Sequence, residues 1–184
     1  MAVEVRVLDD PAADAARRLA AAASAGGHVA LTGGSSPRAA YEQAGGLSAQ
    51  WGEATLWWGD ERCVPPDDDR SNYGLARDAL IARLDPAPTV ERIRGEDGPG
   101  PGAEHYERAL RTAFGDRPPA FDLLLLGLGP DGHCASLFPG APALGVGDRW
   151  VVGVERAGQP PYVPRISLTL PALTAARETV FLVI

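Results

Sequence analysis

Short apolar segments alternate with longer amphipathic stretches along this chain. The apolar segments have the length of β-strands and lie at residues 3–8, 29–32, 54–58, 121–126, 150–154, 166–170 and 179–184. Between them, stretches rich in Ala or carrying one apolar face predict helices over residues 12–25, 37–44, 72–84 and 103–114. The alternation predicts an α/β fold with a mostly parallel sheet and helices on both of its faces.

Residues that begin and end helices support these boundaries. Asp10 and Pro11 supply an N-cap and a first-turn proline for the first helix, and Gly26 with Gly27 ends it. Pro37 begins the second helix, and Ser71 or Asn72 caps the third. Residues 95–102, which are rich in Gly and Pro, are expected to form a surface loop.

Length and composition indicate a single domain spanning residues 1–184, with 45% apolar residues to build its core. The apolar runs are far shorter than the roughly 20 residues of a membrane span. Charges interrupt the first residues, unlike those of a signal peptide. We therefore expect a cytoplasmic protein without a membrane partner. Because the chain stops inside the apolar segment 179–184, we also expect the natural protein to continue beyond it.

The charge of the chain argues against nucleic acid as a partner. The formal net charge is −7, and the 17 basic residues, all Arg, form no basic run. A small phosphate can still bind where a few Arg side chains and backbone N–H groups converge. Cys63 and Cys134 do not have the number or spacing of a disulfide framework or a zinc site, so no metal is expected.

Three polar loops follow predicted strands, at residues 33–37, 60–62 and 127–133. Ligands of open α/β sheets bind beyond the carboxyl ends of the strands, so we expect these loops to form one site. Residues 33–37 read Gly-Gly-Ser-Ser-Pro and predict either a phosphate cradle or a tight turn with a Ser cap. Asp60 and Arg62 either hold a substrate or form a surface ion pair, and Arg165 either binds a phosphate or pairs with an acid.

Loop 127–133 has the G-x-G-x-x-G spacing of a dinucleotide-binding motif. That interpretation is disfavoured because the loop carries Asp131, and because Pro139 and Pro142 interrupt any helix that follows. Asp131 and His133 indicate a different chemistry. A histidine can take a proton from water near neutral pH, and a carboxylate two residues away can orient the imidazole.

Five segments of the chain together resemble the 6-phosphogluconolactonase family. They lie at residues 31–37, 58–65, 69–73, 126–140 and 165–171, in the order in which the family carries them. The resemblance implies hydrolysis of 6-phospho-D-glucono-1,5-lactone to 6-phospho-D-gluconate, the second step of the oxidative pentose phosphate pathway, without a cofactor. It also implies a modified Rossmann-like fold similar to those of glucosamine-6-phosphate deaminase and ribose-5-phosphate isomerase.

The same resemblance implies roles for individual residues. His133 would be the base that activates water, and Asp131 its partner. The implied substrate-binding residues, which include the phosphate contacts, are Gly33, Gly34, Ser35, Arg38, Asp60, Arg62 and Arg165. The family also carries a C-terminal Lys-bearing turn and a helix, which residues 1–184 lack. The partner is a small phosphorylated sugar lactone, and we expect a monomer.

Three other functions stay open at this point. An enzyme like glucosamine-6-phosphate deaminase/isomerase shares the Asp-Gly-His of loop 127–133, but it carries Asp-Glu-Tyr where this chain has residues 60–62. It also carries an Asn-Glu pair where this chain has residues 136–139, so both differences favour the lactonase. A non-catalytic phosphosugar-binding protein would keep the cradle and Arg165 but could lose the base. A dinucleotide-binding oxidoreductase is the third alternative.

Overall fold

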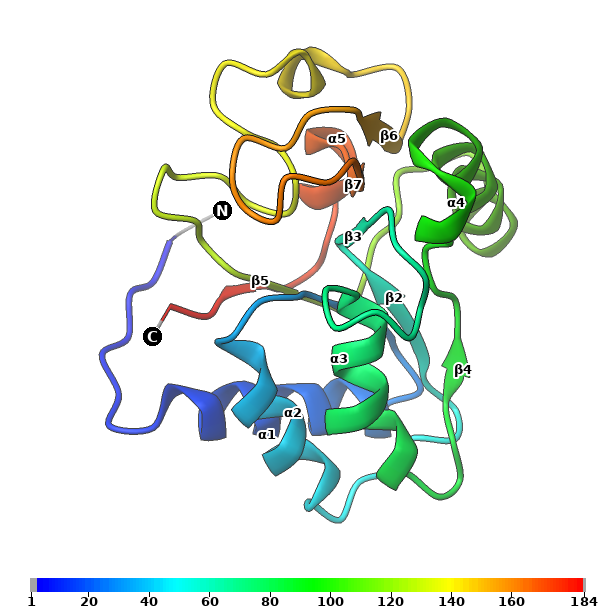
Figure 1. The fold of residues 1–184 in the computed structure, drawn as a ribbon. Coiled ribbons are helices and arrows are strands. Elements are labelled where there is room, and N and C mark those ends of the chain that lie inside the picture. Colours follow the sequence, from blue (N-terminus) through cyan, green and yellow to red (C-terminus); the bar gives the residue numbers. More distant parts are fainter. Residues whose placement is uncertain (1–2, 184) are drawn as a thin grey trace.

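The computed structural model describes residues 3–183 and arranges their strands in two sheets (Figure 1). The larger sheet has five parallel strands in the order β4-β2-β1-β5-β8. These strands are β1 (His28–Leu31), β2 (Thr55–Trp58), β4 (Thr89–Val90), β5 (Leu123–Leu126) and β8 (Thr179–Phe181). The four leucines of β5 are all buried. The prediction of a mostly parallel sheet is therefore confirmed.

Helices lie on both sides of this sheet (Figure 1). α1 (Pro11–Ser24), α2 (Pro37–Gly45) and α3 (Asn72–Ala79) lie together on one side, and α4 (Pro99–Phe114) lies on the other. Asp10 accepts a hydrogen bond from the backbone N–H of Ala13 at 2.9 Å, which is the N-cap that the sequence predicts for α1. The remaining helical segments are short: Ile81–Arg83, Gly95–Asp97, Pro142–Gly145 and α5 (Leu170–Leu173).

A second, antiparallel sheet was not foreseen from the sequence. Its strands are β3 (Asp60–Arg62), β7 (Arg165–Leu168) and β6 (Val151–Val154), in the order β3-β7-β6. The prediction of a loop at residues 60–62 is wrong, because these residues pair with β7. The register places Asp60 opposite Ser167 and Arg62 opposite Arg165. Since paired residues of adjacent strands point to the same face, this pairing gathers four polar side chains on one face of the sheet.

The predicted strand at residues 3–8 does not form. These residues lie in coil, and the side chains of Val3, Val5 and Val7 are 91%, 83% and 95% exposed. An alternating sequence becomes a strand only when a neighbour accepts its backbone hydrogen bonds, and the described part of the chain offers residues 3–8 no such neighbour. Residue 184, at the end of the predicted strand 179–184, lies outside the described residues.

The predicted surface loop at residues 95–102 is also wrong. α4 begins at Pro99 and runs through Gly102, which is buried against the second sheet. A Cβ atom at Gly102 would lie 2.4 Å from Ile166 Cδ1, so only glycine allows the helix to approach so closely. The Gly/Pro content that suggests a loop therefore serves helix packing.

Two buried tyrosines fix the places where β1 and β2 end. Tyr41 of α2 accepts a hydrogen bond from Thr32 N at 2.9 Å and donates one to Thr32 O at 2.7 Å. Tyr106 of α4 does the same for Trp58, at 2.8 and 3.0 Å. Each hydroxyl satisfies backbone groups that a continuing strand would otherwise pair. The loops after β1 and β2 can therefore turn away from the sheet at this edge.

An aromatic cluster surrounds Trp57 on the side of the sheet that α4 covers. His28 accepts a hydrogen bond through Nδ1 from Trp57 Nε1 at 3.0 Å, and Phe114 packs on both rings. Burial lowers the pKa of His28, which keeps the imidazole neutral and able to accept this bond. Both His28 and Trp57 thus have structural roles, as expected for residues outside the predicted site.

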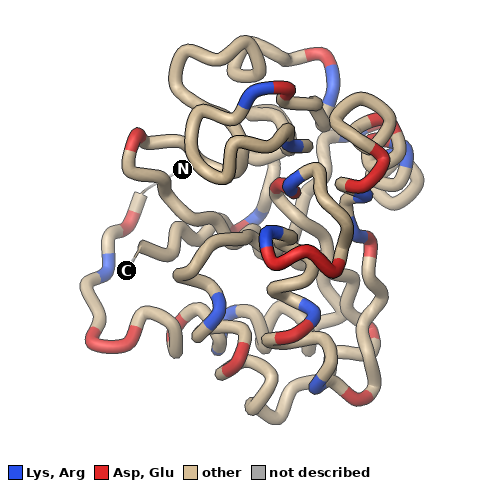
Figure 2. The backbone as a smooth tube through the Cα atoms, viewed as in Figure 1, with Lys and Arg blue, Asp and Glu red and all other residues tan. Residues whose placement is uncertain are grey.

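The described helices include none that is both long and apolar enough to cross a membrane. Figure 2 shows the basic residues distributed over the whole tube, with acidic and uncharged segments between them. This distribution agrees with the absence of a basic run in the sequence.

Candidate active site

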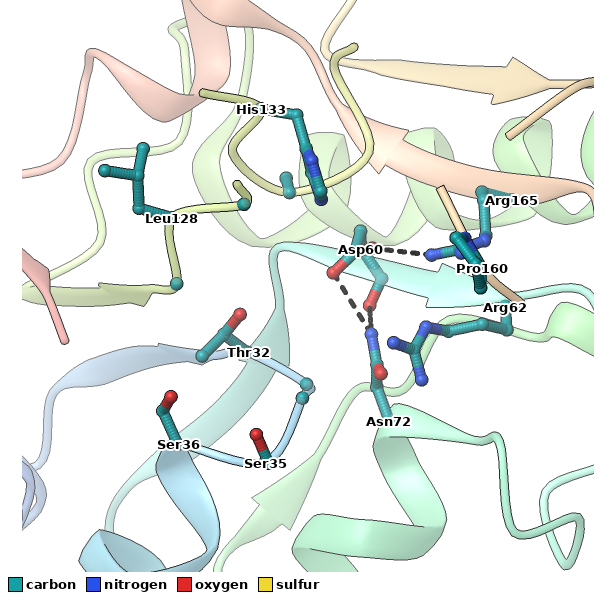
Figure 3. Close-up of a pocket in the computed structure, with 15 residues that line it drawn as sticks. Thr32, Ser35, Ser36, Asp60, Arg62, Asn72, Leu128, His133, Pro160 and Arg165 are labelled. Atoms are coloured by element: carbon teal, nitrogen blue, oxygen red, sulfur yellow. Dashed lines mark hydrogen bonds and ion pairs between the residues drawn. The ribbon is translucent and has the colours of Figure 1, made fainter. Parts of the chain in front are cut away.

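A cavity of about 210 Å³ lies at the carboxyl ends of β1, β2 and β5. Its walls come from all three loops that the sequence singles out, together with parts of α3 and the segment before β7. Figure 3 shows His133 on one wall and Ser35 with Ser36 on the facing wall. The lining residues are Thr32, Gly33, Gly34, Ser35, Ser36, Asp60, Arg62, Asn72, Gly127, Leu128, Gly129, His133, Ala135, Pro160 and Arg165.

Asp131 and His133 form a close pair at the end of β5. His133 Nδ1 lies 2.5 Å from Asp131 Oδ1, and the same oxygen accepts a hydrogen bond from His133 N at 3.2 Å. The hydrogen bond with His133 lowers the pKa of Asp131 to about 2. The carboxylate therefore accepts a proton donated by Nδ1, which leaves Nε2 as the basic nitrogen. Nε2 has no hydrogen-bond partner within residues 3–183.

The glycines of loop 127–133 make room for this pair. A Cβ atom on Gly129 would lie 2.1 Å from both Nδ1 and Cε1 of His133, so the imidazole occupies the space of a side chain at position 129. Gly132 has φ of +85°, a conformation that lets the chain turn between Asp131 and His133. The spacing that resembles a dinucleotide motif thus positions a histidine.

Asp60 is the centre of a buried polar network. Its Oδ2 accepts a hydrogen bond from Ser136 Oγ at 2.6 Å and lies 4.0 Å from Arg165 Nη1. Its Oδ1 and backbone oxygen accept bonds from Asn72 Nδ2 at 3.1 and 2.9 Å. Ser167, opposite Asp60 in the ladder, accepts a bond from Ser136 N at 3.1 Å. The network joins β3, β7, α3 and the loop that carries the histidine.

Arg165 is 3% exposed, and its partners are the carboxylate of Asp60 and two backbone oxygens. Its Nη2 donates to the backbone oxygens of Gln159 at 3.2 Å and Pro161 at 2.9 Å, so this edge of the guanidinium holds the preceding segment. Its Nε is buried without a partner within residues 3–183. Burial and the positive charge of Arg62 both lower the pKa of Arg165, although a guanidinium stays charged near neutral pH. Only part of Arg165 is therefore available to a ligand.

Glu61 anchors the start of α3 beside the cavity. Its carboxylate is 2% exposed and accepts bonds from Asn72 N at 2.7 Å, Tyr73 N at 2.8 Å and Ser71 Oγ at 3.0 Å. Burial raises the pKa of Glu61 to about 7, against the opposing effect of its backbone donors. Glu61 points away from the face that carries Asp60 and Arg62, because successive residues of a strand alternate. It thus connects β3 to α3 and fixes where Asn72 lies.

The loop after β1 faces the cavity with backbone groups. Gly34 has φ of +96°, and Ser36 at the N-cap of α2 makes no capping bond with its side chain. The first N–H groups of α2 are therefore without a side-chain cap and lie at the positive end of the helix dipole. At Gly33 a Cβ atom would lie 1.7 Å from Asn72 Oδ1, so glycine is needed there to admit Asn72.

A family model described as glucosamine-6-phosphate isomerases/6-phosphogluconolactonase matches residues 4–184. The chain belongs to this family. A 6-phosphogluconolactonase of Synechocystis sp. is 41% identical to it over an alignment of 167 positions, which covers 85% of this chain and 66% of the relative. The chain thus spans slightly less than two thirds of the length of this family member.

Solved structures within the family support the fold. A 6-phosphogluconolactonase of Thermotoga maritima matches with a TM-score of 0.83 and 30% identity, over 95% of this chain and 80% of that one. A monomeric glucosamine-6-phosphate deaminase matches with a TM-score of 0.79 at 18% identity, over 97% and 80% of the two chains. The predicted likeness to the deaminase fold is therefore confirmed, and the likeness to ribose-5-phosphate isomerase stays a prediction.

The residues that the family resemblance indicates do not all face one cavity. Asp131 stands beside His133 without lining the cavity, and Arg38 is exposed, with its nearest acidic partner Glu42 at 3.8 Å. Arg38 lines a neighbouring pocket with Arg77 and several acidic residues. The other predicted site residues line the cavity together.

Sequence reasoning missed three residues of this family site. The sequence predicts Ser71 or Asn72 as the cap of the third helix; Ser71 is the cap, and the amide of Asn72 lies in the cavity wall with Oδ1 buried and unpaired within residues 3–183. Ser136 lies in the family-like segment 126–140 and could have been suspected there. Gln159 lies in an irregular segment with no pattern, and only the structure reveals that its side chain donates to Asp131 Oδ2 at 3.2 Å.

The remaining candidate chemistry of the chain is limited. Within residues 3–183, no group of three or more His, Cys, Asp or Glu side chains is arranged to hold a metal ion. Burial raises the pKa of Cys63 to about 11 and also raises the pKa of Cys134. Both thiols are therefore protonated near neutral pH and poor nucleophiles.

Proposed function

We propose that this chain forms the active site of a 6-phosphogluconolactonase, which hydrolyses 6-phospho-D-glucono-1,5-lactone to 6-phospho-D-gluconate. The observation that carries the proposal is the Asp131–His133 pair, with Nδ1 bound to the carboxylate and Nε2 free beside a polar cavity. Such a pair is the arrangement that general base catalysis by histidine requires. The names of its family relatives support the same reaction.

In the proposed mechanism, His133 Nε2 takes a proton from a water molecule as the water oxygen attacks C1 of the lactone. The carbonyl oxygen then carries the negative charge of a tetrahedral intermediate. When the intermediate collapses, the bond between C1 and the ring oxygen breaks, and the ring oxygen takes the proton from His133. Asp131 stays ionised and stabilises the positive imidazolium between these two steps.

We place the phosphate of the substrate at the wall facing His133. There, Ser35, Ser36 and the first N–H groups of α2 offer hydrogen-bond donors, and Arg62 supplies a positive charge. Arg62 Nη1 donates to Arg70 O at 2.6 Å, which holds its guanidinium in place. With the phosphate at this wall, the lactone ring would extend toward Nε2 of His133. Arg38, in the adjacent pocket, would act on the phosphate only through long-range charge.

The residue at position 62 helps to distinguish lactonase chemistry from deaminase chemistry. β3 places Arg62 in the cavity wall, in the position where the family resemblance implies a tyrosine in the deaminases. A cation at this position suits an anionic substrate and offers no acid or base for isomerisation. We therefore favour the lactonase over an enzyme like glucosamine-6-phosphate deaminase.

The test is hydrolysis of the lactone by the protein and by a His133→Ala variant, with spontaneous hydrolysis subtracted. Loss of a general base should lower kcat by roughly 100- to 10,000-fold while binding of 6-phosphogluconate, measured by calorimetry, is retained. His105→Ala, on α4 outside the cavity, is the matched control and should keep its activity. Normal hydrolysis by His133→Ala would refute the mechanism, and release of ammonia from glucosamine 6-phosphate would replace the lactonase with the deaminase.

A further inference from the structure

The segment between β6 and β7 contributes Pro160 to the wall of the cavity, and we refer to residues 157–164 as the strap (orange in Figure 1). It has no helix or strand of its own. Its position is set by Arg165, whose Nη2 donates to the backbone oxygens of Gln159 and Pro161. Pro160, held between these two bonds, lines the cavity (Figure 3).

The strap reaches the catalytic pair through one side chain. Gln159 Nε2 donates to Asp131 Oδ2 at 3.2 Å, while Asp131 Oδ1 is engaged by His133. A carboxylate bound through only one oxygen can rotate about its last side-chain bond, since that torsion has a broad energy minimum. With different partners on its two oxygens, the Asp131 carboxylate keeps one orientation. Gln159 is thus the second anchor of the group that orients His133.

Packing also holds the strap against the loop that carries His133. A Cβ atom on Gly158 would lie 3.0 Å from the ring of Phe138, so the strap backbone lies directly against that ring. The centroid of Phe138 lies 4.7 Å from that of His133. The strap therefore contacts both sides of the catalytic unit: the carboxylate through Gln159 and the imidazole through Phe138.

We propose that Gln159 is a positioning residue, which holds Asp131 so that His133 keeps its proton on Nδ1 and presents Nε2 to water. Gln159 acts through Asp131 and not on the substrate. Arg165, by fixing the backbone of Gln159, extends this support from the β3–β7 sheet to the histidine. The effect on catalysis rests on the proposed lactonase function, whereas the effect on the imidazole does not.

The first experiment compares substitutions at position 159 in the lactonase assay. Gln159→Leu keeps the size of the side chain but removes the donor, and should lower kcat about tenfold with KM changed less than twofold. Gln159→Lys restores an N–H donor at similar reach and should recover at least half of the wild-type kcat. Gln50→Leu, at an exposed position before β2, is the matched control and should behave as wild type. Wild-type kcat in Gln159→Leu, or an equal loss in Gln159→Lys, would overturn the proposal.

The second experiment needs no activity. The chain has three histidines, so ¹⁵N-histidine labelling gives three pairs of imidazole signals, which His→Gln variants can assign. At pH 8.5 the wild-type signals of His133 should be those of the Nδ1–H tautomer, and Gln159→Leu should shift them toward a mixture of tautomers.

The two experiments separate the possible failures. If the tautomer shifts but the wild-type protein hydrolyses no lactone, the positioning role holds and the proposed function fails. If hydrolysis is normal and the tautomer stays the same in Gln159→Leu, the positioning role fails and the proposed function stands.

Discussion

Replacement of Gly129 by Ala should displace the His133 imidazole while leaving the fold intact. The new Cβ atom would lie 2.1 Å from Nδ1 and Cε1 of the ring, and an ordinary contact begins at 3.4 Å. The ring must therefore retreat by about 1.3 Å, or the loop must shift by a similar distance. The ring also contacts Asp131 at 2.5 Å and packs on Phe138, so any retreat disturbs one of these contacts.

The expected cost follows from the size of this displacement. Misplacement of a catalytic group by about 1 Å can lower a rate roughly 100-fold, which corresponds to about 2.7 kcal/mol of activation free energy. We therefore expect Gly129→Ala to lower kcat for the lactone about 100-fold, with a small change in KM. Gly129 does not have a positive φ, so the substitution adds no backbone strain. The thermal unfolding temperature should fall by only a few degrees.

Two further glycine variants make the test specific. Gly147→Ala lies in a loop with open space around its Cβ position and should retain wild-type kinetics. Gly127→Ala, in the same loop as Gly129 but with no protein atom within 4 Å of its Cβ position, should leave the ¹⁵N signals of His133 unchanged. Wild-type kcat in Gly129→Ala, or an unshifted imidazole signal, would show that the close packing of glycine and histidine does not control the reaction.

Two other predictions concern the cavity wall and stability against pH. Gly33→Ala should push Asn72 out of its hydrogen bonds to Asp60 and lower the free energy of unfolding, measured by chemical denaturation, by about 1–3 kcal/mol. In an Asn72→Ala background these bonds are already lost, so the same Gly33→Ala substitution should lower the free energy of unfolding much less. Burial lowers the pKa of His28 below its ordinary 6.5. As pH falls, His28 therefore takes up a proton in the unfolded chain before it does so in the folded protein. The contribution of His28 to stability is thus present above pH 6.5 and is lost below it. The stability advantage of wild type over His28→Leu in chemical denaturation should therefore be smaller at pH 5.5 than at pH 7.5, and a constant difference would contradict this assignment.

The parallel sheet could be predicted because its signals are local. β5 is apolar on both faces, and α1 has its cap, its first-turn proline and its terminating glycines adjacent in sequence. The β3–β7 sheet could not be predicted, since residues 60–62 carry three charges in a row and acquire strand structure only by pairing with residues more than 100 positions away. The predicted strand at residues 3–8 is wrong for the opposite reason: its alternation is local, but no strand within residues 3–183 pairs with it.

The same distinction applies to the site. Asp131 and His133 could be paired from sequence because they are two residues apart in one loop. The approach of Asp60 and Arg62 to Arg165 depends on the register of β3 with β7, and that register has no signature in the sequence. Gln159 was the least predictable of all, because an uncharged side chain in an irregular segment gains a role only from the carboxylate that it faces.

The glycines beside this cavity require a different explanation from the one that their spacing suggests. In dinucleotide-binding folds, glycines after a strand let the backbone approach a pyrophosphate. At two of the cavity glycines, the space left by the missing Cβ atom is filled by a side chain of the protein itself: Asn72 at Gly33 and His133 at Gly129. At Gly34 and Gly127, no protein atom lies within 4 Å of the Cβ position. Both of these side chains line the cavity. The amide of Asn72 and the ring of His133 can lie this close to the backbone only because positions 33 and 129 are glycines. A glycine motif after a strand therefore indicates close approach, and the neighbouring polar residues decide whether a ligand or a catalytic side chain makes that approach.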